Sequence, residues 1–321
     1  TIALKGKDQF NGDIDESSSK AEKLSSKIGK GLGAAAKIGA AAVGAAATAI
    51  GALTKTALDN YAEYEQLVGG AELMFGEAFS FIEEKSKNAY STVQMSQNDY
   101  LRQVNGFATG LKTALGGNAQ AAAELADRII NAEADVVAAT GNSQEAVQNA
   151  FNGIMKSDFT MLDNLQLGIT PTKEGFQEVI DKVNDWNAAN GKATKYQIEN
   201  LADCQSALVD YIEMQGLAGY AADEAAGTIQ GSISMMKAAW TNLLTGIGDD
   251  TQDMDKLIDN FAESTGTAAE NILPRLEQIL IGVGKLAERL APVVAAAIPG
   301  LVTTVLPNLV QSGISMVGDR K

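Results

Sequence analysis

A stretch composed almost entirely of Ala and Gly constrains this chain more than any other feature. It runs from Gly31 to Leu53, GLGAAAKIGAAAVGAAATAIGAL, and carries a single charge, Lys37. Ala has the highest helix propensity of all residues, whereas each interior Gly costs roughly 1 kcal/mol. Because Ala outnumbers Gly here, the stretch predicts a helix.

Three pairs of small residues recur along this helix at a spacing of four: Ala35 with Gly39, Ala40 with Gly44, and Ala47 with Gly51. Residues four apart share one helix face. Each pair therefore offers a flat surface that a second backbone can approach closely, as in small-xxx-small helix dimers. We expect this helix to pack against other helices, in a bundle or in lipid. The alternative is a buried helix within one compact domain.

The composition favours an all-α fold with thin, Ala-rich cores. Hydrophobic residues make up 45% of the 321 residues but aromatic residues only 6%, and the chain has 32 Gly and 5 Pro. With so little Pro, Gly is expected to separate the helices. The length allows two or three domains.

Four regions follow from these patterns. We expect a polar N-terminal arm over 1–28, a long Gly/Ala-rich helix over 29–70 that stops at Gly69-Gly70, an acidic multi-helix region over 71–250, and apolar C-terminal helices over 251–321.

Helix starts in the acidic region are marked by residues that cap helices well. The predicted caps are Ser96, Asn118, Ser143, Thr172 and Thr194. Gly follows the expected helix ends, and one further helix is predicted over 221–244. Apolar residues recur at the helical spacing, as in Phe176, Val179, Ile180 and Val183.

Charge is unevenly distributed along the chain. The net charge is −15, with eight Lys and Arg against six Asp and Glu in 1–60, and 13 against 31 in 61–276. Residues 277–321 hold four against three. An acidic middle argues against nucleic-acid binding, which needs Lys and Arg to neutralise phosphates. We therefore expect no specific nucleic-acid partner.

The residues needed for common catalytic chemistry are missing. The chain has no His, and its one cysteine, Cys204, has no base to activate it and is expected to be an inert buried thiol. Trp186 and Trp240 lie in amphipathic helical patterns and are expected to pack in the core.

Three short motifs give no support for a site. Ser234 and Lys237 fit S-x-x-K without its companion motifs. The acids from Asp249 to Asp259 lack the Gly and Glu of a calcium loop and are better explained as an acidic helix start. Gly31, Gly33 and Ala36 match a dinucleotide fingerprint without a preceding strand. We expect no enzyme, no cofactor and no metal ion.

The C-terminal region from Asn271 to Gly318 is strongly apolar. Pro292, Pro299 and Pro307 divide it into short helical pieces. Its uncharged run, Leu290–Val317, is long enough to span a bilayer, although three prolines disfavour one straight helix. The alternatives are insertion into lipid and packing on copies of itself. The residues expected to make these contacts are Leu290, Val294, Ile298, Leu301, Val305 and Leu309.

Four stretches together carry a resemblance to a known family. They are YAEYEQLVGGAELMFGEA from Tyr61, the long run ALGGNAQAAAELADRIINAEADVVAAT…TMLDNLQLGITPTKEGFQEVI from Ala114, TIQGSISMMKAAWTNLLTGIGDD from Thr228, and NILPRLEQILIGVGKLAERLAPVVAAAIPGLVTTVLP from Asn271. In this order they resemble the tail tape measure proteins of long-tailed phages and prophages of Gram-positive bacteria. The similarity spans roughly residues 57–318.

The resemblance implies a structural role. Tape measure proteins are helical, occupy the lumen of the tail tube, set tail length and leave ahead of the DNA. It implies assembly in the bacterial cytoplasm as a homo-oligomer, a trimer or hexamer. The implied partners are the tail tube protein, tail assembly chaperones, distal tail or baseplate proteins, and the host membrane on ejection.

The chain departs from that family in length. Family members are usually longer, with coiled-coil stretches and sometimes a cell-wall hydrolase domain, so this chain is expected to be a fragment or a short member. The alternative function is that of a membrane-active protein whose apolar segments, 38–53 and 290–317, insert into lipid. Ejection from the tail followed by insertion would combine the two roles.

Overall fold

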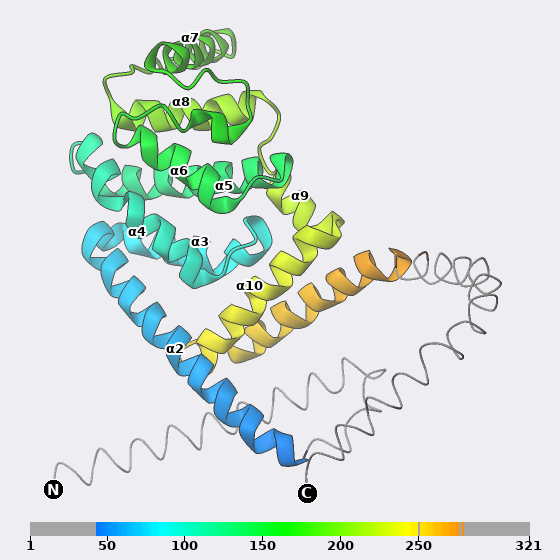
Figure 1. The fold of residues 1–321 in the computed structure, drawn as a ribbon. Coiled ribbons are helices and arrows are strands. Elements are labelled where there is room, and N and C mark those ends of the chain that lie inside the picture. Colours follow the sequence, from blue (N-terminus) through cyan, green and yellow to red (C-terminus); the bar gives the residue numbers. More distant parts are fainter. Residues whose placement is uncertain (1–42, 250, 276–277, 279–321) are drawn as a thin grey trace, which may run out of the picture. The chain divides into compact units, whose positions relative to one another are not determined.

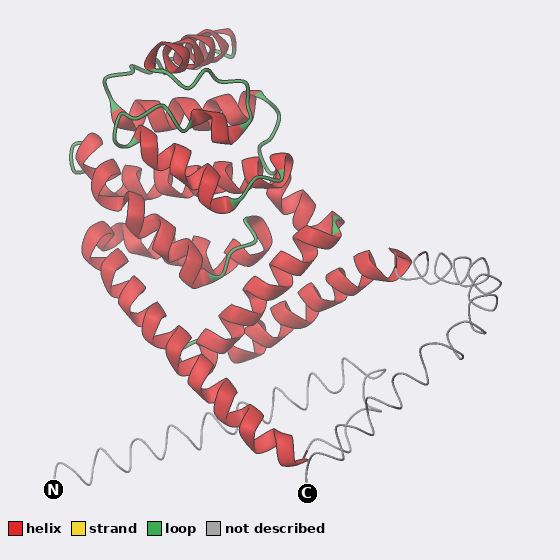
Figure 2. Ribbon diagram, viewed as in Figure 1, coloured by secondary structure: helices red, strands yellow, loops and turns green. Residues whose placement is uncertain are grey.

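The computed structural model describes residues 43–249, 251–275 and 278, with side chains from residue 55 onward (Figure 1). Every regular element in these ranges is a helix and none is a strand, which confirms the predicted all-α class (Figure 2). Within the same ranges, no helix combines the length and the apolar character needed to cross a membrane.

The helices stack on one another around a central member, α5. In chain order the elements are α2 (Val43–Phe75), the 3-10 turn η2 (Gly76–Ala78), α3 (Phe79–Thr92), α4 (Gln97–Ala114), α5 (Ala119–Thr140), α6 (Gln144–Ile154), the 3-10 turn η3 (Leu162–Leu165), α7 (Lys173–Ala189), α8 (Leu201–Met214), α9 (Tyr220–Gly227) and α10 (Ile229–Ile247). A further helix covers 254–275. Helices α2, α4, α5, α8 and α7 follow one another through the stack, and α5 also contacts α3, α6 and α9 (Figure 1).

Four predicted helix caps are confirmed. The side-chain oxygens of Ser96, Asn118, Ser143 and Thr172 each accept a hydrogen bond from the backbone N–H three residues later, at 3.1–3.2 Å. Each bond satisfies one of the N–H groups that a helix start leaves unpaired. The cap residues therefore fix where α4, α5, α6 and α7 begin.

The predicted helix stop at Gly69-Gly70 is wrong. Helix α2 continues to Phe75, and the chain turns at Gly76, whose φ is +56°. A Cβ added to Gly70 would lie 3.2 Å from the Asn105 amide nitrogen. Gly70 thus leaves room for α4 to pack closely. The next residue, Ala71, is buried, and its packing stabilises the helix beyond Gly70.

The predicted start at Thr194 is also wrong. Asn200 caps α8 instead, through its side-chain oxygen to the N–H of Ala202 at 2.9 Å. The preceding loop cannot become helical because its backbone is bound elsewhere: the Asn184 side chain of α7 pairs with both the N–H and the C=O of Tyr196, at 2.7 and 3.0 Å.

The helix predicted over 221–244 is divided in two. Thr228 adopts an extended conformation, ends α9 and caps α10 by accepting from the N–H of Gly231 at 2.9 Å. Gly231 permits the tight corner, because a Cβ there would lie 2.3 Å from the Glu224 carbonyl oxygen. Apolar residues recur at the helical spacing on both sides of this corner. The spacing in the sequence therefore does not show that the helix ends at Thr228.

Helices α2 and α4 run parallel and are joined at heptad intervals. Side-chain nitrogens of Asn98, Asn105 and Lys112 donate to the backbone carbonyls of Asn60, Leu67 and Met74, at 2.9, 2.9 and 2.8 Å. Seven residues make nearly two helical turns, so the three bonds lie along one seam. This ladder fixes the axial register of α2 against α4.

The described residues up to 268 pack as one unit with two apolar clusters. The main core joins α2 to α8, and its largest fully buried side chains include Tyr100, Phe107, Phe151 and Phe176. A small cluster joins α2, α10 and the helix from residue 254; its buried members are Ala57, Leu243, Leu244, Ile247 and Ile258. Trp240 packs against it, with its ring 5.0 Å from that of Phe261.

Two further expectations have different outcomes. Cys204 is buried, as predicted, and that burial raises the pKa of its thiol to about 12. The core position predicted for Trp186 is wrong: its ring is half-buried on α7, with the Lys192 ammonium 4.5 Å from the ring centre. The Lys192 ammonium covers one face of the indole ring in a cation–π contact, in place of an apolar side chain from the core.

Candidate functional site

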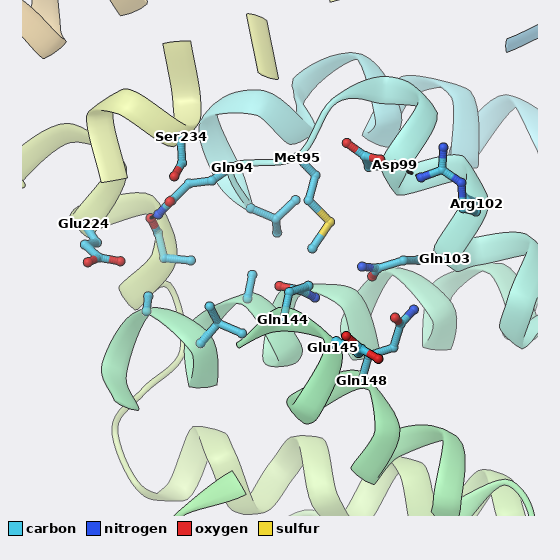
Figure 3. Close-up of a pocket in the computed structure, with 15 residues that line it drawn as sticks. Gln94, Met95, Asp99, Arg102, Gln103, Gln144, Glu145, Gln148, Glu224 and Ser234 are labelled. Atoms are coloured by element: carbon cyan, nitrogen blue, oxygen red, sulfur yellow. Dashed lines mark hydrogen bonds and ion pairs between the residues drawn. The ribbon is translucent and has the colours of Figure 1, made fainter. Parts of the chain in front are cut away.

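A cavity of about 520 Å³ with a mixed polar and apolar lining lies where several helices meet (Figure 3). Its walls come from the α3–α4 loop, α4, α5, α6, α9 and α10. Volumes of this size are typical of ligand pockets. Its polar lining residues are Gln94, Asp99, Arg102, Gln103, Gln144, Glu145, Gln148, Glu224 and Ser234. Its apolar part comes from Val93, Met95, Ala134, Val137, Ala138 and Ala221.

The loop between α3 and α4 is held in an unusual conformation at the cavity. Gln94 has a φ of +58°, a left-handed conformation that costs a non-Gly residue roughly 1–2 kcal/mol. Its amide donates to the Ala221 carbonyl of α9 at 2.9 Å. The N–H groups of Val93 and Met95 both bind the Ala89 carbonyl at the end of α3. These bonds offset the strain and direct Met95 toward the middle of the cavity (Figure 3).

The charged groups give the cavity an excess of negative charge. Arg102 is its one lining cation, and that guanidinium is already shared between Asp99, at 2.6 Å, and Glu63 of α2. None of the described cations forms an ion pair with Glu145 or Glu224. The cavity therefore favours a cationic occupant over an anionic one.

Two amide groups face the cavity with one end unpaired. Gln103 of α4 and Gln144 of α6 point toward the middle from different walls (Figure 3). The Gln103 Oε1 and Gln144 Nε2 atoms are buried, and neither has a hydrogen-bond partner in the described part of the chain. Buried polar atoms in folded proteins are nearly always paired with protein, water or ligand. Because these two atoms have almost no exposed surface, a group in the cavity does not reach them in this conformation.

Helix α5, which lines one side of the cavity, also carries buried carboxyl groups outside the lining. Both Asp135 oxygens accept backbone N–H bonds, from Gly219 and Ala221 at 2.9 Å, and so fix the start of α9. Burial raises the pKa of Asp135. Glu133 is fully buried, neither of its oxygens has a partner within the described residues, and burial raises its pKa well above the usual range.

Away from the cavity, a cluster of polar side chains joins α5, α7 and α8. The Arg128 guanidinium and the Tyr196 hydroxyl donate to the two oxygens of the buried Asp210, at 2.5 and 2.7 Å. The Asn187 amide approaches the same carboxylate at 3.5 Å. All four side chains are engaged with one another, so this cluster has a structural role.

The packing residues expected from the sequence remain predictions. Gly44, Ala47 and Gly51 lie in α2, in the turns whose side chains are not described, while Ala35, Gly39 and Ala40 lie outside the described residues. The apolar residues expected at Leu290, Val294, Ile298, Leu301, Val305 and Leu309 also lie outside the described residues.

The short motifs have structural explanations. Ser234 lines the cavity but the exposed Lys237 does not, so the two do not form a site together. Asp253 accepts from the N–H of Lys256 at 3.1 Å, as expected of an acidic helix start, and Asp249 binds Thr251 in a turn. Among the described residues, no three His, Cys, Asp or Glu side chains converge to hold a metal ion.

Reasoning from the sequence did not identify the cavity residues. Gln103, Gln144 and Glu224 are ordinary helix residues, and each is far from the others in the chain. They lie on α4, α6 and α9, three helices that are not consecutive in the chain. Only the packing of these helices shows that the side chains meet.

Comparisons with models of protein families, with curated proteins and with solved structures find no match to this chain.

Proposed function

We propose that this chain is a phage tail tape measure protein, a structural component of the tail-tube lumen that sets tail length. The proposal is supported by the four stretches that resemble this family, by the all-helical fold and by the long helix α2. The same role includes self-association and contact with the tail tube, the assembly chaperones and the distal tail proteins.

The anchoring of α2 is the observation that carries the proposal. Its 33 residues correspond to about 50 Å at 1.5 Å per residue. Residues 57–75 are held by α4, α10 and the ladder of side-chain bonds, whereas the first turns extend past α10 (Figure 1). A rigid helix fixed at one end to a folded body converts chain length into distance, which is what a ruler requires.

A deletion in the first turns of α2 tests this role. Removing Ala45–Gly51 takes out one heptad and leaves Gly44 beside Ala52, so a small residue still occupies the packing face. We expect tails shorter by whole tube rings, measured by electron microscopy of phage carrying the deletion. Duplicating the same seven residues is the matched control and should lengthen the tail or leave it unchanged. Normal tails after every such deletion along the gene would end the proposal.

The membrane-active alternative depends on residues 38–53 and 290–317. Residues 43–53 belong to α2, which is not apolar enough to cross a membrane, while 38–42 and 290–317 lie outside the described residues. It stays a prediction, supported by the apolar composition of 290–317.

A further inference from the structure

We draw no further inference here: the strongest candidate, the exposed face of helix α2 that carries Leu58, Gly69 and Leu73, is an unpartnered helix face, and nothing in the described part of the chain shows what covers it.

Discussion

The main core and the small cluster hold the two halves of α2 in different ways. The half near Phe75 packs against α4 and the main core, with Ala71 and Phe75 fully buried and the ladder fixing its register. The half near Ala57 packs against α10 and the helix from residue 254, in a small cluster with five buried apolar side chains among the described residues. Local stability follows the amount of apolar surface removed from water. The small cluster is therefore expected to open first, while the main core remains folded.

Truncating one buried side chain in each cluster should give the largest effect and tests whether the two clusters unfold separately. Phe151→Ala in the main core should lower the free energy of unfolding by about 3–5 kcal/mol, and Leu244→Ala in the small cluster by about 2–5 kcal/mol. The two should differ in hydrogen exchange: Leu244→Ala should speed exchange in 251–268 and leave 97–214 protected. Loss of protection across both regions would show that the clusters unfold as one.

Filling the close contact between α2 and α10 should weaken the small cluster alone. A Cβ at Gly248 would lie 2.7 Å from the Cβ of Tyr61, so Gly248→Ala must push the helices apart, at about 1–3 kcal/mol. The control is Gly106→Ala in α4, where nothing lies within 4 Å of the new Cβ and stability should rise by about 0.5–1 kcal/mol. Thermal denaturation measures both, and a tolerated Gly248→Ala would contradict the close packing.

Neutralising Glu133 should strengthen the main core by a smaller amount. Its folded pKa is raised by burial, so its contribution to stability is fully present below the unfolded pKa, about 4.3, and is lost as pH rises through the folded pKa. Glu133→Gln should therefore gain about 1–2 kcal/mol at pH 8 and little at pH 4. Glu124→Gln, exposed on the same helix, should change neither value in denaturant titrations. Equal gains at both pH values would contradict a buried, titrating carboxyl.

Local sequence signals correctly located four of the helix starts that depend on one side chain, and missed those at Asn200 and Thr228. Ser96, Asn118, Ser143 and Thr172 cap their helices through bonds that span only three residues, so the sequence contains the whole interaction. The same reasoning failed at Gly70 and Thr194, where distant residues decide. Asn105 packs over the first, and Asn184 binds the backbone just beyond the second.

The amino-acid sequence by itself determined the all-α class, four helix starts and the burial of residues such as Phe176 and Val183, because each depends on periodicity or on neighbours within one or two turns. Only the tertiary structure decided the register of α2 on α4 and the cavity between helices. Both depend on which side chains meet across gaps of tens of residues, such as Asn105 with Leu67 or Gln94 with Ala221. A helical repeat specifies the face that is buried but not the neighbour that covers it, since many helices present similar apolar faces.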